Sequence, residues 1–193
     1  MTLVEVMVIA ALFAIISFAV MNSIASFYRF NAYTIAQAYQ VNNARRGVEF
    51  MVRDMREMTF ADDGTFPLVS MSTSTISFYS DIDRDDSVEL VTYDLASTTL
   101  TKYVYNAAGT PPTYSTTTPD EIFTISEYVQ NLNQGQQMFT YYDENGSPTT
   151  ATSSVIDVRY IDAQVIVNVD PIRDPGEFML RSSAALRNLK ENY

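Results

Sequence analysis

The sequence begins with a long apolar segment that carries a single acidic residue. Residues 1–21 read MTLVEVMVIAALFAIISFAVM, and no lysine or arginine precedes Arg29. From Val6 to Tyr28 there are 23 uncharged residues, which as an α-helix would span about 35 Å and cross a hydrocarbon core of about 30 Å. We therefore expect the segment to lie in lipid or in a lipid-like protein core. A carboxylate near one end of such a helix is costly without a partner, so Glu5 is the residue to explain.

The order of residues around Glu5 separates two interpretations. An ordinary membrane anchor with a stray glutamate would satisfy the hydropathy alone. The run TLVEV from Thr2 to Val6, however, resembles the start of a mature type IV pilin or type II secretion pseudopilin, in which Phe or Met begins the chain and an apolar helix follows. The resemblance implies cleavage before Met1 by a prepilin peptidase and methylation of the new amine. The implied processing motif is Met1, Thr2, Leu3, Val4 and Glu5.

The charge bias of the segment agrees with such cleavage. Lys and Arg normally lie on the cytoplasmic side of a membrane span, and here every basic residue follows the apolar segment. Taken alone, this bias would leave the bulk of the chain in the cytoplasm, and a basic leader removed before Met1 would reverse the orientation. An intact secretory signal peptide fits less well, because its apolar region of about 7 to 15 residues ends at a small-residue cleavage site.

Composition limits the functions open to the remainder of the chain. A net charge of −11 with a pI near 4.3 argues against a nucleic-acid-binding surface, for which a basic stripe is expected. The sequence has no Cys, which excludes disulfides and thiolate metal sites. It also has no His and no recognisable nucleophile or phosphate-binding motif. We therefore expect neither catalysis nor a cofactor.

A second helical segment is predicted to continue the first. Residues 24–58 contain one glycine, Gly47, and no proline, so the helix is expected to run to about residue 58. On its solvent side, Arg53 is spaced to pair with Glu49 and with Glu57. The opposite face carries an apolar stripe at helical spacing, which predicts packing against a sheet. The stripe comprises Val41, Ala44, Val48, Met51, Val52, Met55 and Met58.

Beyond a cluster of helix breakers at residues 61–67, the apolar period changes to two and predicts an antiparallel meander. The Asn145–Gly146 step predicts a tight hairpin, and the Pro-, Thr- and Ser-rich residues 106–119 predict an exposed loop. Strands are predicted at 75–80, 88–95, 100–105, 138–142, 155–169 with a break near Asp162, and 178–182.

The predicted fold class is α+β, with a long N-terminal helix whose second half packs on an antiparallel β-sheet head. Three segments are expected. Residues 1–28 form an apolar membrane or filament-core helix, residues 29–61 its amphipathic continuation, and residues 62–193 a β-rich globular head.

An acidic run between two predicted strands is the candidate metal site. Asp81, Asp83, Asp85, Asp86 and Glu89 supply carboxylates, the ligands that calcium prefers. The run does not match an EF-hand, which needs a glycine and a glutamate at positions where this sequence has other residues. Asp-rich tips between strands are usually turns in which each Asp bonds its own backbone, so a turn without metal is the favoured interpretation.

Further motifs narrow the resemblance. Arg53 and Arg56 late in the helix, followed by residues 76–95, 139–146 and 180–190, resemble the J-type and W-type branch of minor pilins and pseudopilins. The resemblance implies a pilin fold and a structural subunit that polymerises through its N-terminal helix into an extracellular type IV pilus. In this family the carboxylate at the position of Glu5 pairs with the amine of a neighbouring subunit, here that of Met1.

The same resemblance implies partners and a location. The partners are like subunits in a helical filament, the cytoplasmic membrane before assembly, the pilus assembly machinery and the prepilin peptidase. The chain is then expected in the cytoplasmic membrane first and at the cell surface afterwards, in a filament that serves adhesion or motility. Two alternatives stay open: a minor pseudopilin of a secretion or DNA-uptake pseudopilus, and a solitary membrane-anchored extracellular binding domain.

Overall fold

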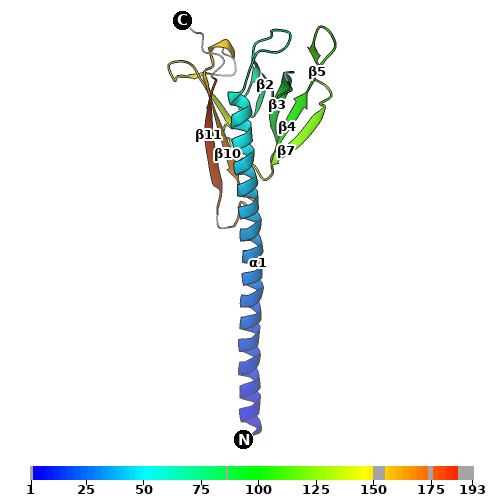
Figure 1. The fold of residues 1–193 in the computed structure, drawn as a ribbon. Helices are drawn as coiled ribbons and strands as arrows, with labels where there is room; N and C mark the ends of the chain where they lie inside the picture. Colours follow the sequence, from blue (N-terminus) through cyan, green and yellow to red (C-terminus); the bar gives the residue numbers. More distant parts are fainter. Residues whose placement is uncertain (1, 86, 150–154, 174–175, 187–193) are drawn as a thin grey trace. The chain divides into compact units, whose positions relative to one another are not determined.

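The computed structural model describes residues 2–85, 87–149, 155–173 and 176–186, which form a long α-helix followed by antiparallel β-structure (Figure 1). Helix α1 covers Leu3–Arg56 without interruption, so it ends slightly before the expected residue 58. The chain divides into two compact units, Met1–Tyr39 and Gln40–Tyr193. These elements confirm the predicted α+β class.

The described part of the first unit is a helix with apolar side chains on every side. All residues from 2 to 32 are exposed, and Leu3, Phe13 and Phe18 expose 77%, 71% and 71% of their surface. By length and composition alone, α1 is also apolar enough to cross a membrane. A helix that is apolar all round is stable only when lipid or protein covers it, because water has no favourable contact with such a surface.

In the second unit, a five-stranded antiparallel sheet has the order β1-β2-β3-β4-β7. Strands β2, β3 and β4 lie where the period-two pattern predicts them. Strands β1 and β7 were not predicted, because β1 is only four residues long and the sequence of β7, EIFTIS, begins without alternation. The bounds are β1 Leu68–Met71, β2 Thr75–Ser80, β3 Glu89–Ala96, β4 Thr99–Tyr105 and β7 Glu121–Ser126.

A second, four-stranded sheet has the order β11-β10-β8-β9. The predicted hairpin at Asn145–Gly146 is confirmed, since β8 and β9 pair antiparallel around it and Gly146 has φ +75°. The elements are β8 Phe139–Tyr142, β9 Pro148–Thr149, the 3-10 helix η1 Val155–Asp157, β10 Tyr160–Val167 and β11 Phe178–Ala185.

The predicted break near Asp162 is wrong. Asp162 lies inside β10, opposite Thr140 of β8 and Ser183 of β11, and its carboxylate accepts a hydrogen bond from Arg181. The strand tolerates the charged Asp162 because Arg181 on the neighbouring strand pairs with its carboxylate. The interruption falls earlier, between η1 and β10.

The Pro- and Thr-rich segment at residues 106–119 is mostly exposed, as predicted, but it contains local structure. Strands β5 (Ala107–Ala108) and β6 (Thr113–Tyr114) pair antiparallel. The Tyr114 ring lies 4.8 Å from the Tyr79 ring, centroid to centroid. This aromatic contact holds the segment against the five-stranded sheet.

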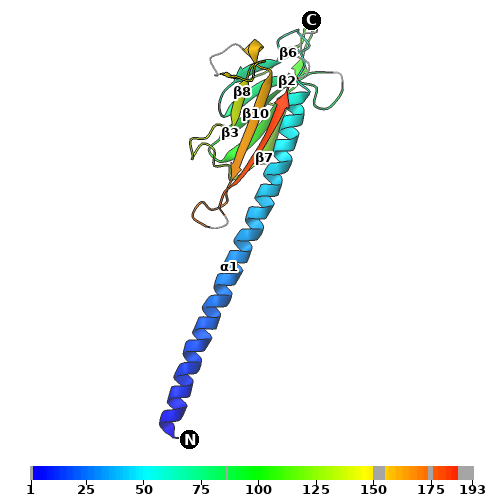
Figure 2. The same cartoon turned by 90° about the vertical axis from the view of Figure 1, so that its left-hand side faces the viewer.

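The apolar stripe of α1 is the centre of the core in the second unit. Each of its members is buried except Val41, which is half-buried, and Met51 and Met55 are fully inaccessible. Its buried members form one cluster with residues of both sheets, among them Phe78 of β2 and Ile161 of β10. Figures 1 and 2 show the cyan end of α1 beside both sheets. Burying one such side chain stabilises the fold by about 1.5–3 kcal/mol.

Gly47 permits the close approach of α1 to β7. A Cβ at this position would lie 2.4 Å from Cγ2 of Ile125 and 3.1 Å from the carbonyl oxygen of Ile125. No side chain fits there unless Ile125 shifts. The glycine is therefore retained inside a helix, where it costs about 1 kcal/mol relative to alanine, for a packing reason.

We predict that Gly47→Ala lowers the free energy of unfolding by about 1–2 kcal/mol, since overpacking outweighs the gain in helix propensity. The measurement is urea unfolding of the detergent-solubilised full chain, followed by tyrosine fluorescence, because the sequence has 13 Tyr and no Trp. On an Ile125→Ala background, which removes Cγ2, the same substitution should destabilise less. Equal losses on both backgrounds would contradict this account.

Candidate functional site

The first turn of α1 contains a reciprocal hydrogen-bonded cap made by Thr2 and Glu5. The Thr2 N–H donates to Oε2 of Glu5 at 2.8 Å, and the Glu5 N–H donates to Oγ1 of Thr2 at 3.3 Å. This is a capping box, in which an N-terminal Thr and a Glu three residues later satisfy each other's backbone donors. The negative charge also lies at the positive end of the helix dipole.

The capping box gives the TLVE sequence a local structural role that our sequence analysis did not assign. The Thr-x-x-Glu spacing ahead of an apolar run was the signal that could have revealed it. Leu3 and Val4 lie in the same first turn and are exposed. Met1 lies outside the described residues, so its predicted contact with Glu5 stays a prediction.

Small residues interrupt the exposed apolar surface of the same helix. Ala10, Ala11, Ala14 and Ala19 are exposed among larger side chains such as Leu12 and Ile15. Alanines at this spacing allow another helix to approach closely, which is how helices associate in an apolar surrounding. Because α1 is continuous through residues 14–22, this surface is presented on regular helix.

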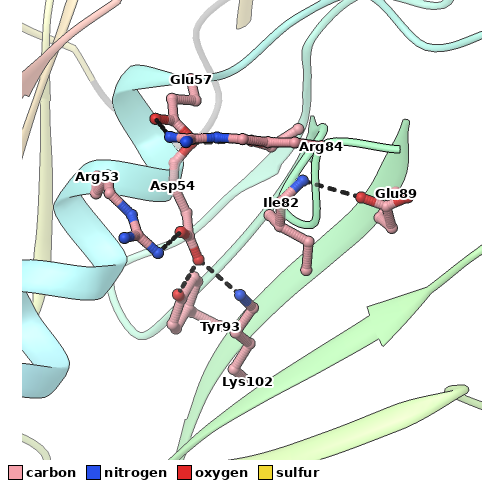
Figure 3. A network of polar contacts seen from close by, with 9 residues as sticks. Arg53, Asp54, Glu57, Ile82, Arg84, Glu89, Tyr93 and Lys102 are labelled. Atoms are coloured by element: carbon pink, nitrogen blue, oxygen red, sulfur yellow. Dashed lines mark hydrogen bonds and ion pairs between the residues drawn. The ribbon is translucent and has the colours of Figure 1, made fainter. Parts of the chain in front are cut away.

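A buried ion pair connects α1 to the five-stranded sheet (Figure 3). Oδ2 of Asp54 lies 2.7 Å from Nζ of Lys102 on β4 and accepts a hydrogen bond of 2.7 Å from the Tyr93 hydroxyl on β3. The side chains of Asp54 and Lys102 are 3% and 12% exposed. Burial, with the nearby Asp54 carboxylate, raises the pKa of Tyr93 well above its usual value. The sequence predicted neither contact, because 39 and 48 residues separate Asp54 from its partners.

The predicted pairs of Arg53 on the helix surface are wrong. Glu49 pairs with Arg45 at 3.3 Å, and Glu57 pairs with Arg84 at 3.4 Å. Arg53 instead lies 3.9 Å from Asp54 and over the ring of Phe50. Arg84, in the loop between β2 and β3, thus pairs with Glu57 in place of Arg53.

The acidic run between β2 and β3 forms a turn, as the favoured interpretation of its sequence predicted. Oδ1 of Asp81 accepts from the Arg84 N–H, Oδ1 of Asp83 from the Asp85 N–H, and Oδ1 of Asp85 from the Ser87 N–H. These are the local bonds typical of Asp in turns. Asp86 lies outside the described residues.

Glu89 joins this loop from the start of β3. Carboxylate oxygens of Asp81, Asp83 and Glu89 lie within 4.8 Å of one another, while Oε2 of Glu89 accepts a hydrogen bond from the Ile82 N–H. Burial raises the pKa of Glu89 to about 7, and the Asp83, Asp81 and Asp85 charges add to this increase, although the Ile82 N–H opposes it. The loop therefore holds a carboxyl group that is protonated below neutral pH.

Comparison with known proteins yields a structural neighbour in a secretion system. The neighbour is a chain of the GspK-GspI-GspJ complex of the Type 2 Secretion System from enterotoxigenic Escherichia coli. The two structures align over 77% of this chain and 97% of the neighbour, with a TM-score of 0.47 and 13% sequence identity. No protein-family model and no curated protein matches the sequence. At this identity, function has to be argued from the residues of this chain.

We predict that Lys102→Met lowers the free energy of unfolding by about 3 kcal/mol, because it removes the buried cation of Asp54 and leaves only the exposed Arg53, 3.9 Å away. The matched control is Arg84→Met, which removes an exposed pair with Glu57 and should cost about 1 kcal/mol or less. Urea unfolding of the full chain in detergent measures both. Equal effects of the two substitutions would contradict the assigned difference in burial.

A second prediction concerns the pH dependence of stability. Since the pKa of Glu89 is about 7 when folded against an ordinary value of 4.5, the folded state binds the proton more tightly. Stability should therefore fall as the pH rises from about 4.5 to 7. Glu89→Gln removes this titration, so the wild-type chain should lose more unfolding free energy than the variant across this interval. Parallel pH profiles of the two proteins would refute the assignment.

Proposed function

We propose that the chain is a structural subunit that polymerises through its N-terminal helix into an extracellular type IV pilus filament, and that it catalyses no reaction. The observation that carries this proposal is the helix surface at residues 2–32, which is exposed, carries apolar side chains on every side and is uncharged apart from Glu5 and Arg29. A surface of this kind needs a covering that the chain itself does not provide. Identical helices of neighbouring copies would provide it.

Transfer of this helix from lipid into a bundle of like helices conserves most of its apolar burial. The transfer is therefore driven by packing and polar contacts more than by the hydrophobic effect. The alanines at positions 10, 11, 14 and 19 supply places where helices can approach closely. In this proposal the cytoplasmic membrane stores the subunit after a prepilin peptidase has cut before Met1, and the assembly machinery then extracts it.

Glu5 is the residue that would make assembly selective. In an apolar surrounding its carboxylate needs more than the one bond from the Thr2 N–H, because an anion in a low-dielectric medium is costly without a cation. Carried over from the family, the amine of Met1 on the adjacent copy is the proposed cation. The pairing would set the axial position of one subunit against the next.

The same helix surface would serve a minor pseudopilin of a short secretion or DNA-uptake pseudopilus, the second candidate function. The two differ in where the polymer is found. A pilus is recovered as long filaments sheared from the cell surface, whereas a pseudopilus subunit stays with the envelope. A solitary membrane-anchored binding domain would give no polymer at all.

We predict that Glu5→Gln and Glu5→Ala both reduce filament yield on the order of tenfold or more, since each removes the charge that pairs with the neighbouring amine. The comparison is informative because Gln preserves the capping box and Ala does not. Filaments are sheared from cells, counted by electron microscopy and identified by mass spectrometry.

Thr2→Ala is the matched control, because it removes the capping hydroxyl and keeps the charge. Its yield should stay close to that of the wild type, with a helix start weakened by about 1 kcal/mol. Normal yield from Glu5→Gln together with loss from Glu5→Ala would assign Glu5 to capping alone. Absence of any polymer from the wild-type chain would overturn the proposed function.

A further inference from the structure

Basic side chains in the Gln40–Tyr193 unit gather on the exposed face of α1. We call Arg45, Arg46, Arg53 and Arg56 the arginine stripe; all four are exposed, Arg46 and Arg53 on the face of α1 opposite the buried apolar stripe and Arg45 and Arg56 at its edge. Their partners within the chain are local: Glu49 for Arg45, Asn43 for Arg46 and the Ser183 carbonyl for Arg56. The stripe is a third of the 12 basic residues in a chain of net charge −11.

Acidic side chains of the same unit gather on two adjoining loops. The acidic patch comprises Asp62 and Asp63 after α1, and Asp81, Asp83 and Asp85 between β2 and β3. The Val88 N–H donates to Oδ2 of Asp62 at 3.3 Å, so the two loops are in contact. The basic residue inside the patch, Arg84, is directed towards Glu57, as Figure 3 shows.

Half of the arginine stripe, Arg45 and Arg46, lies too far from the acidic patch for the two to neutralise each other within one molecule. Arg45 precedes Glu57, which follows α1 directly and which the patch contacts through Arg84, by 12 residues, which is about 18 Å along a helix. Surface charges this far apart are screened at physiological salt, where the Debye length is about 8 Å. A second copy displaced along the helix axis could bring them together.

We propose that the acidic patch of one copy docks on the arginine stripe of a neighbouring copy. The inference rests on the proposed function and names the contact between heads within it. A second copy is the favoured occupant because both complementary surfaces belong to the same chain, and copies of such high net negative charge repel each other unless opposite charges are aligned. Guanidinium groups also bind carboxylates in a fixed two-point geometry. The contact is heterologous, so it repeats along a filament without closing.

A disulfide cross-link tests this contact directly. The sequence has no Cys, so introduced thiols can react only with each other. Arg46→Cys combined with Asp83→Cys in the full chain should give a ladder of covalent oligomers when assembled polymer is oxidised. A mixture of the two single variants should give dimers and no longer species. The control pair is Arg46→Cys with Thr117→Cys, which places the second thiol at an exposed position outside the patch.

Charge reversal provides a second readout. Arg45→Glu with Arg46→Glu should lower polymer yield on the order of tenfold, because like charges then face each other across the contact. Adding Asp83→Lys and Asp85→Lys to the same chain should restore most of the yield. Arg173→Glu, which reverses an exposed charge outside the stripe, should leave the yield within about twofold of the wild type.

The outcomes separate the contact from the function on which it rests. If the wild-type chain polymerises, the Arg46→Cys/Asp83→Cys polymer gives no ladder, and the reversal of Arg45 and Arg46 is tolerated, the docking contact alone is overturned. A wild-type chain that forms no polymer would overturn the proposed function and the contact together. A ladder with rescue by the compensating reversal would support both.

Discussion

The packing of one helix face against two sheets is the interaction on which the Gln40–Tyr193 unit depends. Ala44, Val48, Met51 and Met55 of α1 are buried in a single cluster that includes residues from both sheets. The segment at residues 129–131 also joins the sheets, since the Gln130 N–H and the Asn131 side chain bond to β10. Without the helix, however, each sheet would expose one apolar face, and an isolated sheet of this size has no second layer to bury it.

Two features set the position of that helix on the sheets. The missing side chain of Gly47 lets the backbone of β7 come within contact of α1, and the buried pair of Asp54 and Lys102 ties the helix to β4. A slip of the helix would bring a side chain against Ile125 and separate the buried Asp54 carboxylate from Lys102. Packing alone, by contrast, tolerates exchange among apolar side chains of similar volume. The polar pair and the glycine therefore supply specificity to a core that is rich in flexible methionines.

The two parts of α1 face different physical demands. From residue 44 onwards only one face is apolar, and the chain's own sheets cover it. From residue 2 to residue 32 every described residue is exposed, and apolar side chains lie on all sides of the helix. That part needs a covering that the chain itself does not provide, and the proposed assembly function rests on this need and not on any cluster of reactive side chains. The capping box of Thr2 and Glu5 gives this helix a defined start.

The sequence by itself determined the features that depend on neighbours a few residues apart. These are the apolar helix, the buried stripe, the strands at 75–80 and 100–105, the Asn145–Gly146 hairpin and the Asp-rich turn, because period and turn chemistry are local. Tertiary structure alone decided which distant groups meet. The Asp54–Lys102 pair, the contact of Gly47 with Ile125 and the division into two sheets join residues remote in sequence, and no local pattern encodes such pairings. Asp162 is the clearest case. A break in the strand was predicted near it, but it lies within β10, where Arg181 of the neighbouring strand β11 pairs with its carboxylate.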